Sequence, residues 1–318
     1  MKEKEKIKEI LEKEDNFLVL SHSEPDGDAV GSLYAMGHIL KALGKNFFLF
    51  NPSGIPDTFD WLVPPKEVKT DISDLTWDWA IFLDCSNIER VEGFNLDKKF
   101  KIINIDHHID NTLFGDINWV DASMSSVGEM VAQIAEKLNI SIKGDLAEAL
   151  FLSIVSDTGS FSYGNTTPSV LRLAAKILDN GLDLNKFTAN LTRQWTINKA
   201  HLHGLALADS RLELNGRVGI IRATQDMLKA SKATVEDCTG LVNYMRQIKG
   251  VLVALSLREE EKGLVKFSLR SWGEVDVQEI AADLGGGGHP NASGGKIFAD
   301  IDKAEKIILK TIEKNLRV

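Results

Sequence analysis

The sequence predicts an α/β protein with a larger N-terminal domain, in which helices cover a mostly parallel sheet, and a smaller α+β C-terminal domain. Continuously apolar short runs alternate with helical periodicity in the first half, which is typical of a parallel sheet buried on both faces. The second half carries hairpin signals, which indicate antiparallel strands. A length of 318 residues fits about two domains of roughly 150 residues each. We expect a cleft between these domains.

The elements of the first half follow from this alternation. Strands are expected at 17–21, 46–50, 79–84 and 101–105. Helices are expected at 28–43, 126–138, 146–156 and 169–178, the first ended by Gly44 and the last by Gly181.

The second half begins with a hairpin signal, because Asn215-Gly216 separates two strand-like runs within 211–221. Two further strand-like runs, 251–258 and 264–270, flank a charged turn at 259–263, and helices are expected at 276–284 and 302–316. Residues 189–209 have helical composition and predict a semi-rigid helical linker. We therefore divide the chain into a domain at 1–188, this linker, and a domain at 210–318.

Charge and cysteine content limit the classes of ligand and the cellular location that we expect for this protein. Lys and Arg number 37 against 46 Asp and Glu, so the net charge is −9. A protein that grips a long duplex is usually basic, so a small phosphate-bearing substrate or a bound cation fits better. Two cysteines suit a reducing cytosol, and no apolar run approaches the ~20 residues of a membrane span. We expect a cytoplasmic protein without a membrane partner.

Asp and His residues gather where predicted strands and one predicted helix end. They are His22, Asp26 and Asp28 after the first strand, Asp84 ending another, Asp106, His107 and His108 after the next, and Asp157 after an apolar helix. In an open parallel sheet, ligands bind outside the carboxyl ends of the strands. The pattern therefore predicts that these side chains meet at one edge of the sheet.

Taken singly, each segment also has an ordinary interpretation. Asp26 and Asp28 could cap a helix, because Asp is favoured at that position. The other residues could be strand-end, core or capping residues. A calcium loop of the EF-hand type is excluded, because Val30 and Gly37 stand where acidic residues would be required.

The combination favours a metal site. Clustered carboxylates repel one another unless a cation holds them. Mixed carboxylate and imidazole ligands suit Mn²⁺ or Mg²⁺ better than a thiolate site would. Four Asp charges would balance two divalent ions, as in a two-metal hydrolase.

These motifs resemble the DHH phosphoesterases in order and spacing: His22-x-x-x-Asp26-x-Asp28, Asp84, Asp106-His107-His108 and Asp157. The segment 285–294, Gly-Gly-Gly-Gly-His-Pro-Asn-Ala-Ser-Gly, is similar to the signature of the DHH-associated C-terminal domain. Length and domain pair look most like the branch of nano-RNases and pAp phosphatases. The resemblance implies hydrolysis of very short oligoribonucleotides to mononucleotides, and removal of the 3′-phosphate of 3′-phosphoadenosine 5′-phosphate (pAp) to give AMP.

The resemblance also implies a cofactor of two divalent ions, foremost Mn²⁺, with Mg²⁺ or Co²⁺ as alternatives. One ion would be bound by His22, Asp26 and Asp84, and the other by Asp28, Asp84, His107 and Asp157. Asp84 would therefore bridge the two ions. His108 would face the substrate phosphate, and Asp106 would orient a histidine, as partners of metal-site histidines commonly do.

Other residues are candidates for substrate binding. The glycine run could be a flexible turn or a cradle of backbone N–H groups, supported by a helical turn expected at Pro290. Arginine suits bidentate contact with phosphate, although a strand-end arginine could also be merely exposed. The resemblance assigns substrate contacts to Arg270, Ser271, Gly286, Gly287, Gly288 and His289, and places Arg90 near a phosphate.

The predicted mechanism is metal-assisted hydrolysis in the cleft, with hinge motion about residues 185–209. An inorganic pyrophosphatase is disfavoured by the glycine-rich segment, and a RecJ-like exonuclease for single-stranded DNA by length and charge. A membrane-anchored cyclic-dinucleotide phosphodiesterase is disfavoured by the lack of an anchor, whereas linear dinucleotides stay open as substrates. An inactive nucleotide sensor would be expected to have lost metal ligands. The expected partners are short RNA or pAp, no long duplex, and a second copy in a homodimer.

The six tryptophans are expected in the core or at domain contacts. One of them could stack on a nucleobase, but the sequence does not select which.

Overall fold

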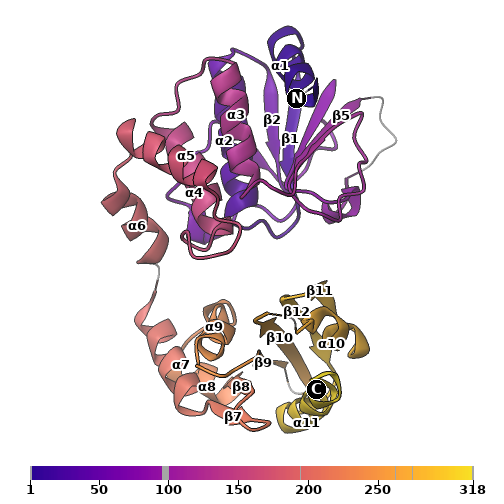
Figure 1. Cartoon of the computed structure of the whole chain (residues 1–318), viewed down its shortest axis with the longest axis vertical. Helices are drawn as coiled ribbons and strands as arrows, with labels where there is room; N and C mark the ends of the chain where they lie inside the picture. Colours follow the sequence, from indigo (N-terminus) through magenta and orange to yellow (C-terminus); the bar gives the residue numbers. More distant parts are fainter. Residues whose placement is uncertain (1, 95–99, 194, 262, 274, 317–318) are drawn as a thin grey trace. The chain divides into compact units, whose positions relative to one another are not determined.

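The computed structural model describes residues 2–94, 100–193, 195–261, 263–273 and 275–316. The chain forms two compact units, Met1–Gln194 (unit 1) and Trp195–Val318 (unit 2). Each is considered by itself below (Figure 1). In the described part of the chain, none of the helices combines the length and apolar content that a membrane crossing requires.

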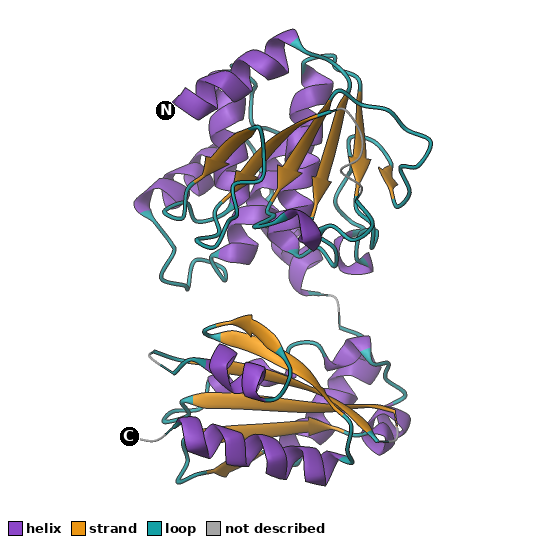
Figure 2. Cartoon of the chain, turned by 90° about the vertical axis from the view of Figure 1, so that its right-hand side faces the viewer, coloured by secondary structure: helices purple, strands orange, loops and turns teal. Residues whose placement is uncertain are grey.

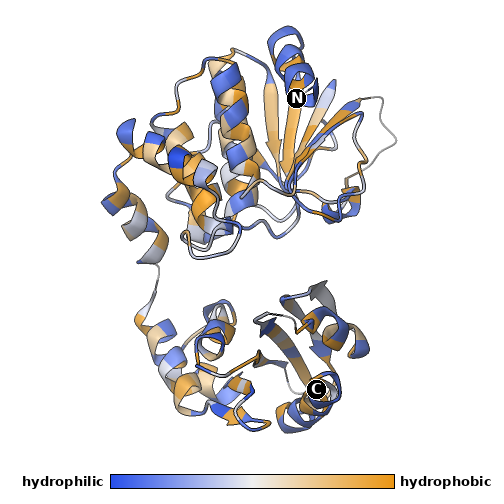
Figure 3. Cartoon of the chain, viewed as in Figure 1, coloured by the Kyte–Doolittle hydropathy of each residue, from blue (hydrophilic) through white to orange (hydrophobic). Residues whose placement is uncertain are grey.

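Unit 1 contains a six-stranded sheet in the order β3-β2-β1-β4-β5-β6, and every neighbouring pair is parallel. The strands are β1 (Phe17–Ser21), β2 (Phe47–Phe50), β3 (Val68–Lys69), β4 (Trp79–Leu83), β5 (Lys101–Asp106) and β6 (Ile117–Val120). The two central strands, β1 and β4, are buried along their whole length, and Figure 3 colours β1 and β2 mostly as hydrophobic. The predicted α/β fold with a parallel sheet is confirmed.

The helices of unit 1 are α1 (Lys2–Lys13), α2 (Gly27–Ala42), α3 (Val127–Lys137), α4 (Asp145–Asp157), α5 (Pro168–Asp179) and α6 (Leu184–Thr192). Helix α2 supplies part of the site and packs against α3 and α4. Nearly all of α2 is buried. A Cβ atom at Gly31 would lie 2.5 Å from the carbonyl oxygen of Ala149, so only glycine lets α2 and α4 approach this closely.

The two faces of this sheet are covered differently. Helices α1–α5 contribute the core on one face. On the other face the covering residues come from loops, and the ring of Phe82 contacts Phe94 and Phe114 edge-on at 5.0 and 5.1 Å. The sheet is thus buried on both faces, as expected, by helices on one face and by loop residues on the other. Aromatic side chains are large enough to exclude water from strands without a helix above them.

Unit 2 contains a second six-stranded sheet, in the order β11-β12-β10-β9-β8-β7. Its strands are β7 (Arg211–Glu213), β8 (Val218–Ala223), β9 (Val253–Glu261), β10 (Leu264–Ser271), β11 (Gly287–His289) and β12 (Ala292–Ile297). Its helices are α7 (Ile197–Ala208), α8 (Gln225–Ser231), α9 (Leu241–Arg246), α10 (Val277–Asp283) and α11 (Ile301–Asn315), and α10 and α11 pack on one face of the sheet (Figure 2).

Both predicted hairpins of unit 2 are present. Asn215 lies between β7 and β8 with a positive φ of 59°, as such a turn requires. β9 extends to Glu261, so most of the segment expected as a charged turn is strand. β8 and β9 pair in parallel, because α8 and α9 lie between them in the chain and provide a crossover.

Residues 189–209 do not form one helix. Phe187 of α6 is buried in unit 1 and contacts Phe151 at 4.9 Å, whereas Leu202 and Ala206 of α7 are buried in unit 2. Each helix has an apolar side, and burying that side against a neighbouring core stabilises it more than exposure in a linker would. The two units therefore adjoin directly in the sequence, near residue 194.

Candidate metal centre

The predicted Asp and His residues meet at the carboxyl edge of the sheet in unit 1. The chain moves from β1 outward to β2 and β3, and from β4 outward in the other direction to β5 and β6. The carboxyl ends of β1 and β4 therefore form a switch point, where open α/β sheets place their ligands. The loop after β1 brings His22, Asp84 directly follows β4, and His107 follows β5.

Asp84 lies between two groups of possible metal ligands. Its Oδ2 is 3.4 Å from His22 Nε2, which is also 3.9 Å from Asp26 Oδ1. Its Oδ1 is 3.7 Å from His107 Nε2. His107 Nε2 is in turn 3.0 Å from Asp157 Oδ2 and 3.7 Å from Asp28 Oδ2.

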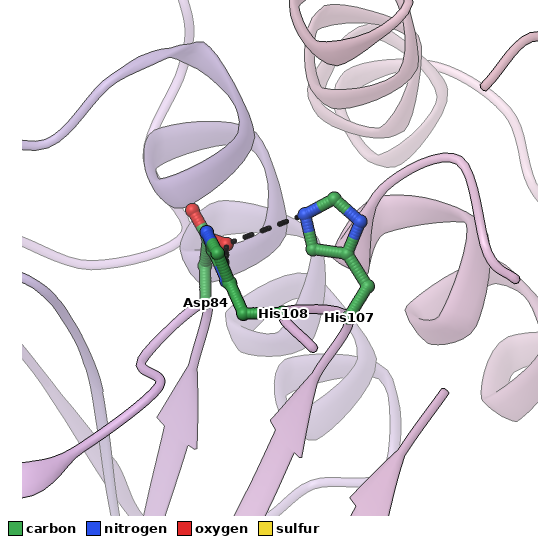
Figure 4. Close-up of side chains that lie close together, drawn as sticks. All are labelled: Asp84, His107 and His108. Atoms are coloured by element: carbon green, nitrogen blue, oxygen red, sulfur yellow. Dashed lines mark ion pairs between the residues drawn. The ribbon is translucent and has the colours of Figure 1, made fainter. Parts of the chain in front are cut away.

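These distances form two compact donor sets. His22, Asp26 and Asp84 offer ligand atoms within 4.8 Å of one another, and so do Asp28, His107 and Asp157. Figure 4 shows His107 and His108, both of which are within ion-pair distance of the Asp84 carboxylate. The six residues expected to hold metal ions thus lie together, with Asp84 facing both sets.

His22 and His107 both present Nε2 to the carboxylates of the donor sets. Nδ1 of His22 bonds to the carbonyl oxygen of Ser23 at 2.8 Å, and Nδ1 of His107 to that of Met124 at 3.2 Å. A carbonyl only accepts hydrogen bonds, so both Nδ1 atoms must carry protons. Each Nε2 is then the atom that can bind a metal ion.

Asp28 is fully buried at the start of α2 and is held by backbone groups of α3. Its carboxylate accepts hydrogen bonds from the N–H groups of Val127 (2.7 Å) and Gly128 (3.1 Å), and from the Ser153 hydroxyl. These bonds fix the Oδ2 atom that faces His107. Gly128 is required, because a Cβ atom there would overlap the Ser153 side chain.

Asp26 has two roles. Its Oδ1 accepts hydrogen bonds from the N–H groups of Asp28 and Ala29 at 3.0 and 3.1 Å, so it caps α2. The ordinary interpretation as a helix cap is therefore correct, and it coexists with the position of Asp26 beside His22.

His108 is oriented by a buried network. Its Nδ1 donates to Asp106 Oδ1 at 2.8 Å, while Asp106 Oδ2 accepts from the Asn111 amide at 2.6 Å. The same amide also donates to Asn104 Oδ1 at 2.8 Å. The bond from Nδ1 to Asp106, itself held by Asn111, fixes the orientation of this half-buried ring.

The protonation of the site reflects its crowded carboxylates. Burial, together with the charges of Asp84 and Asp157, raises the pKa of Asp28 well above its usual value. Burial alone would lower the pKa of His107, but its bond to Asp157 and the other carboxylates raise the pKa to about 10. Burial alone would raise the pKa of Asp84, but the neighbouring histidines lower it overall. Protons on these side chains therefore compensate negative charge that a bound cation can also compensate.

Two features of Asp84 fit a bound cation. Its Oδ1 is buried and has no hydrogen-bond partner among the described residues. An ionised oxygen without a partner is costly in a protein interior unless a charge compensates it. Asp84 also has a positive φ of 59°, and such strain in a residue other than glycine gathers at functional sites. The donor set of carboxylates and imidazoles suits a hard or borderline divalent ion.

Sequence reasoning missed the residues that hold the donors in place. Ser153, Asn104 and Asn111 are uncharged and lie in α4, in β5 and in the loop after β5. The hydroxyl of Ser126 accepts from Glu129 N–H at 3.2 Å and caps α3, while the Glu129 side chain accepts from Ser125 N–H at 2.9 Å. A serine three residues before a glutamate was a signal for this cap, whereas the two asparagines carried no comparable signal.

The expected substrate residues belong to different elements. Arg90 ends a short 3₁₀ helix (Ile88–Arg90) in unit 1, and its carbonyl oxygen accepts from Ser23 N–H at 2.8 Å, next to His22. Arg270 and Ser271 end β10 in unit 2. The side chain of His289 lies outside the described residues.

The glycine-rich segment is a hairpin rather than a loop followed by a helical turn. Residues Gly287–His289 form β11, which pairs with β12, and Pro290 lies in the connecting turn. A Cβ atom at Gly286 would lie 2.2 Å from the carbonyl oxygen of Gly294, and Gly288 has a φ of 141°. The helical turn expected at Pro290 is therefore wrong, and the glycines permit close approach of two backbones.

Both halves of the chain match known domain families. The model of the DHH family, N-terminal domain, matches residues 16–154, and that of the DHHA1 domain matches residues 223–317. A protein of Thermus thermophilus named bifunctional oligoribonuclease and PAP phosphatase is 33% identical, over 94% of this chain and 89% of its own length. The chain belongs to the DHH family.

A further relative and two solved structures are also similar to this chain. A Bacillus subtilis protein of the same name is 28% identical, over 92% of this chain and 93% of its own length. The crystal structure of an exopolyphosphatase-related protein from Bacteroides fragilis superimposes with a TM-score of 0.92 at 25% identity, covering 98% of this chain and 96% of that one. RecJ of Thermus thermophilus in complex with Mn²⁺ shares the fold alone, with a TM-score of 0.54, 13% identity, and coverage of 98% of this chain and 54% of that one.

Proposed function

We propose that this chain is a two-metal phosphoesterase that hydrolyses short oligoribonucleotides to mononucleotides and pAp to AMP, with Mn²⁺ as its preferred ion. The observation that carries the proposal is the position of Asp84, whose two carboxylate oxygens face separate donor sets. The names of the Thermus thermophilus and Bacillus subtilis relatives support the substrate pair. A homodimer and a cytoplasmic location stay predictions.

The two donor sets support a specific choice of ligands. His22, Asp26 and Asp84 would hold one ion, and Asp28, Asp84, His107 and Asp157 the other. Bound there, divalent ions would activate a water molecule for attack on phosphorus and offset negative charge.

The chain's own groups have separate tasks in this proposal. The Asp106 and Asn111 network holds the His108 ring so that Nε2 can donate a hydrogen bond to a phosphate oxygen. Burial alone would lower the pKa of His108, but its bond to Asp106 raises it, so the ring retains this proton more readily than a free histidine. A donor fixed in place stabilises the charge that develops in the transition state without having to reorganise.

Further residues would bind the substrate. Arginine side chains and backbone N–H groups bind phosphate oxygens. The proposed substrate contacts are Arg90, Arg270, Ser271, Gly286, Gly287, Gly288 and His289.

A comparison of substrates tests the function. The purified chain is incubated with Mn²⁺ and, in turn, pAp, a diribonucleotide, a 24-nucleotide RNA and single-stranded DNA, and released mononucleotide or phosphate is measured. We expect the diribonucleotide and pAp to be turned over much faster than the long strands. EDTA should abolish the activity, and Asp84→Ala should lower turnover at least a hundredfold. Asp179→Asn, which removes an exposed charge at the end of α5, should leave it unchanged.

Each other result selects a different function. Preferred hydrolysis of the long strands would indicate a processive exonuclease. Binding of nucleotides without hydrolysis of any substrate would indicate a sensor. Near-normal turnover by Asp84→Ala would contradict the two-metal proposal itself.

A further inference from the structure

The face of the unit 2 sheet opposite α10 and α11 has two parts: helices α7, α8 and α9 cover it over β8 and part of β9, and it is polar and positively charged around β10. Side chains along a strand alternate between faces. On β10, Val265, Phe267 and Leu269 are buried in the core with α10 and α11. The alternate residues, Lys266, Ser268 and Arg270, are therefore directed to the other face.

The strand register aligns three cations across this face. Lys266 pairs with Arg258 of β9 on one side and with Lys296 of β12 on the other. Side chains directly opposite one another lie about 5 Å apart at Cβ, where like charges destabilise a sheet. Arg258 is paired with Glu260. No ion pair with an acidic side chain is found for Lys266 or Lys296 within the described ranges, so this row would be stabilised by an anion from outside.

A row of small polar residues lies beside the cations. Ser268 pairs with Ser256 on β9 and with Gly294 on β12, which has no side chain to cover the face. A cavity of about 200 Å³ opens here, lined by Ser256, Arg258, Lys266, Ser268, Arg270 and residues 238–242. Hydroxyl groups and cations that converge on one hollow are suited to phosphate oxygens.

An exposed tryptophan follows the same strand. Trp272 comes two residues after Arg270, and about half of its surface is exposed. The Arg246 guanidinium lies 4.1 Å from the centre of its ring, and the indole N–H donates to the Arg246 carbonyl oxygen at 2.8 Å. Single-stranded nucleic acids bind to surfaces that combine aromatic rings for their bases with cations along their backbone, and here the fixed ring lies six residues, about 20 Å, beyond Lys266 along the chain.

We propose that this face binds an additional nucleotide segment of a short single-stranded RNA, with Lys266 and Lys296 on its phosphates and Trp272 against a base. The inference rests on the proposed function and extends it. Lys266 and Arg270 are four residues apart on β10, so their Cα atoms are separated by about 13 Å along the strand. That span exceeds a single phosphate group, so the face favours an oligonucleotide over pAp.

Equilibrium binding of a fluorescent pentaribonucleotide to the full chain in EDTA tests the proposal without any turnover. Lys266→Gln combined with Lys296→Gln should weaken binding about tenfold. The slope of log affinity against log salt should fall by about 1.4, since each lost contact to a single strand contributes about 0.7. Trp272→Leu should weaken binding further, whereas Trp272→Phe should retain most of it.

Lys306→Gln combined with Lys310→Gln is the matched control, because it removes the same charge from exposed positions of α11, which packs on the opposite face. It should bind as the unaltered chain does. Equal weakening by both pairs, or no binding by the unaltered chain, would overturn the proposal. Thermal melts keep the result interpretable, because removing cation repulsion should leave the melting temperature unchanged or higher.

Turnover measured with Mn²⁺ distinguishes a failure of this proposal from a failure of the proposed function. The Lys266 and Lys296 variant should retain pAp turnover within about twofold while its KM for the pentanucleotide rises about tenfold. Equal loss on both substrates would overturn the additional segment. Suppose that the unaltered chain hydrolyses none of the substrates, and that the pentanucleotide still binds through this face. The proposed function then fails, whereas the proposed binding face stands.

Discussion

At the scale of single residues, the Nε2 atom of His107 determines how the centre responds to pH. The surrounding carboxylates raise the pKa of His107 to about 10, so the metal-free protein holds a proton there at neutral pH. A metal ion must displace that proton. Apparent Mn²⁺ affinity should therefore rise with pH from 6 to 8.5, by up to about tenfold per pH unit from this group alone.

Calorimetry in buffers of different ionisation enthalpy measures the protons released. We expect about one proton per protein from His107 at pH 7, consistent with release on ligation. An affinity that does not change with pH would contradict the assignment of His107 as a ligand.

Asn111 should affect the rate through His108 without touching the donors. Its amide is bonded to Asp106, which holds the His108 ring. Asn111→Ala should lower kcat about tenfold, because a poorly held donor loses part of its stabilisation of the transition state. The acidic limb of the pH profile should also shift, while Mn²⁺ affinity stays unchanged. A purely structural defect would instead alter metal affinity and stability together.

The residues that could be predicted from the sequence are those whose chemistry is uncommon at their position. Asp84 and His107 are polar residues at the ends of apolar strands, so their position alone suggests a site. Asn111 could not be predicted, because asparagine is ordinary in a loop and its partner Asp106 is reached only through the fold. Ser153 could not be predicted either, because a single serine within an apolar helix gives no signal of its partners.

At the scale of elements, the contact between α2 and α4 positions Asp28. Gly31→Ala should destabilise the protein by about 1–3 kcal/mol, because the new methyl group would meet the Ala149 carbonyl. Gly204→Ala is the control, since a Cβ atom there meets nothing within 4 Å in the helix α7, and it should stabilise by up to about 1 kcal/mol. Thermal melts of both variants measure these changes. A neutral Gly31→Ala would contradict the close packing.

The elements themselves were predictable where periodicity or turn chemistry is local. Buried strands such as β1 read as continuous apolar runs, and Asn215-Gly216 marked its hairpin. The short strand β11 was missed, because the glycines that form it have no side chains and therefore no periodicity. The loop cover on one face of the parallel sheet was missed because aromatic residues such as Phe94 and Phe114 gain their role only from the tertiary structure.

At the scale of the whole molecule, the two units should respond differently to metal. All six candidate ligands belong to unit 1. A ligand that binds only the folded state stabilises it by about 2.7 kcal/mol at a concentration of 100 Kd. In differential scanning calorimetry we therefore expect Mn²⁺ to raise the transition of unit 1 and leave that of unit 2 in place.

The Asp84→Ala variant is the control for this experiment, and it should abolish most of the shift. A shift of both transitions by the same amount would show that the units unfold as one cooperative body.

The spacing of the donors along the chain has a consequence for biosynthesis. His22, Asp26 and Asp84 form one donor set, whereas the other set needs Asp157 at the end of α4. A nascent polypeptide leaving the ribosome therefore acquires the first set well before the second. Both sets are available before any residue of unit 2 has been translated, so metal loading can precede completion of the chain.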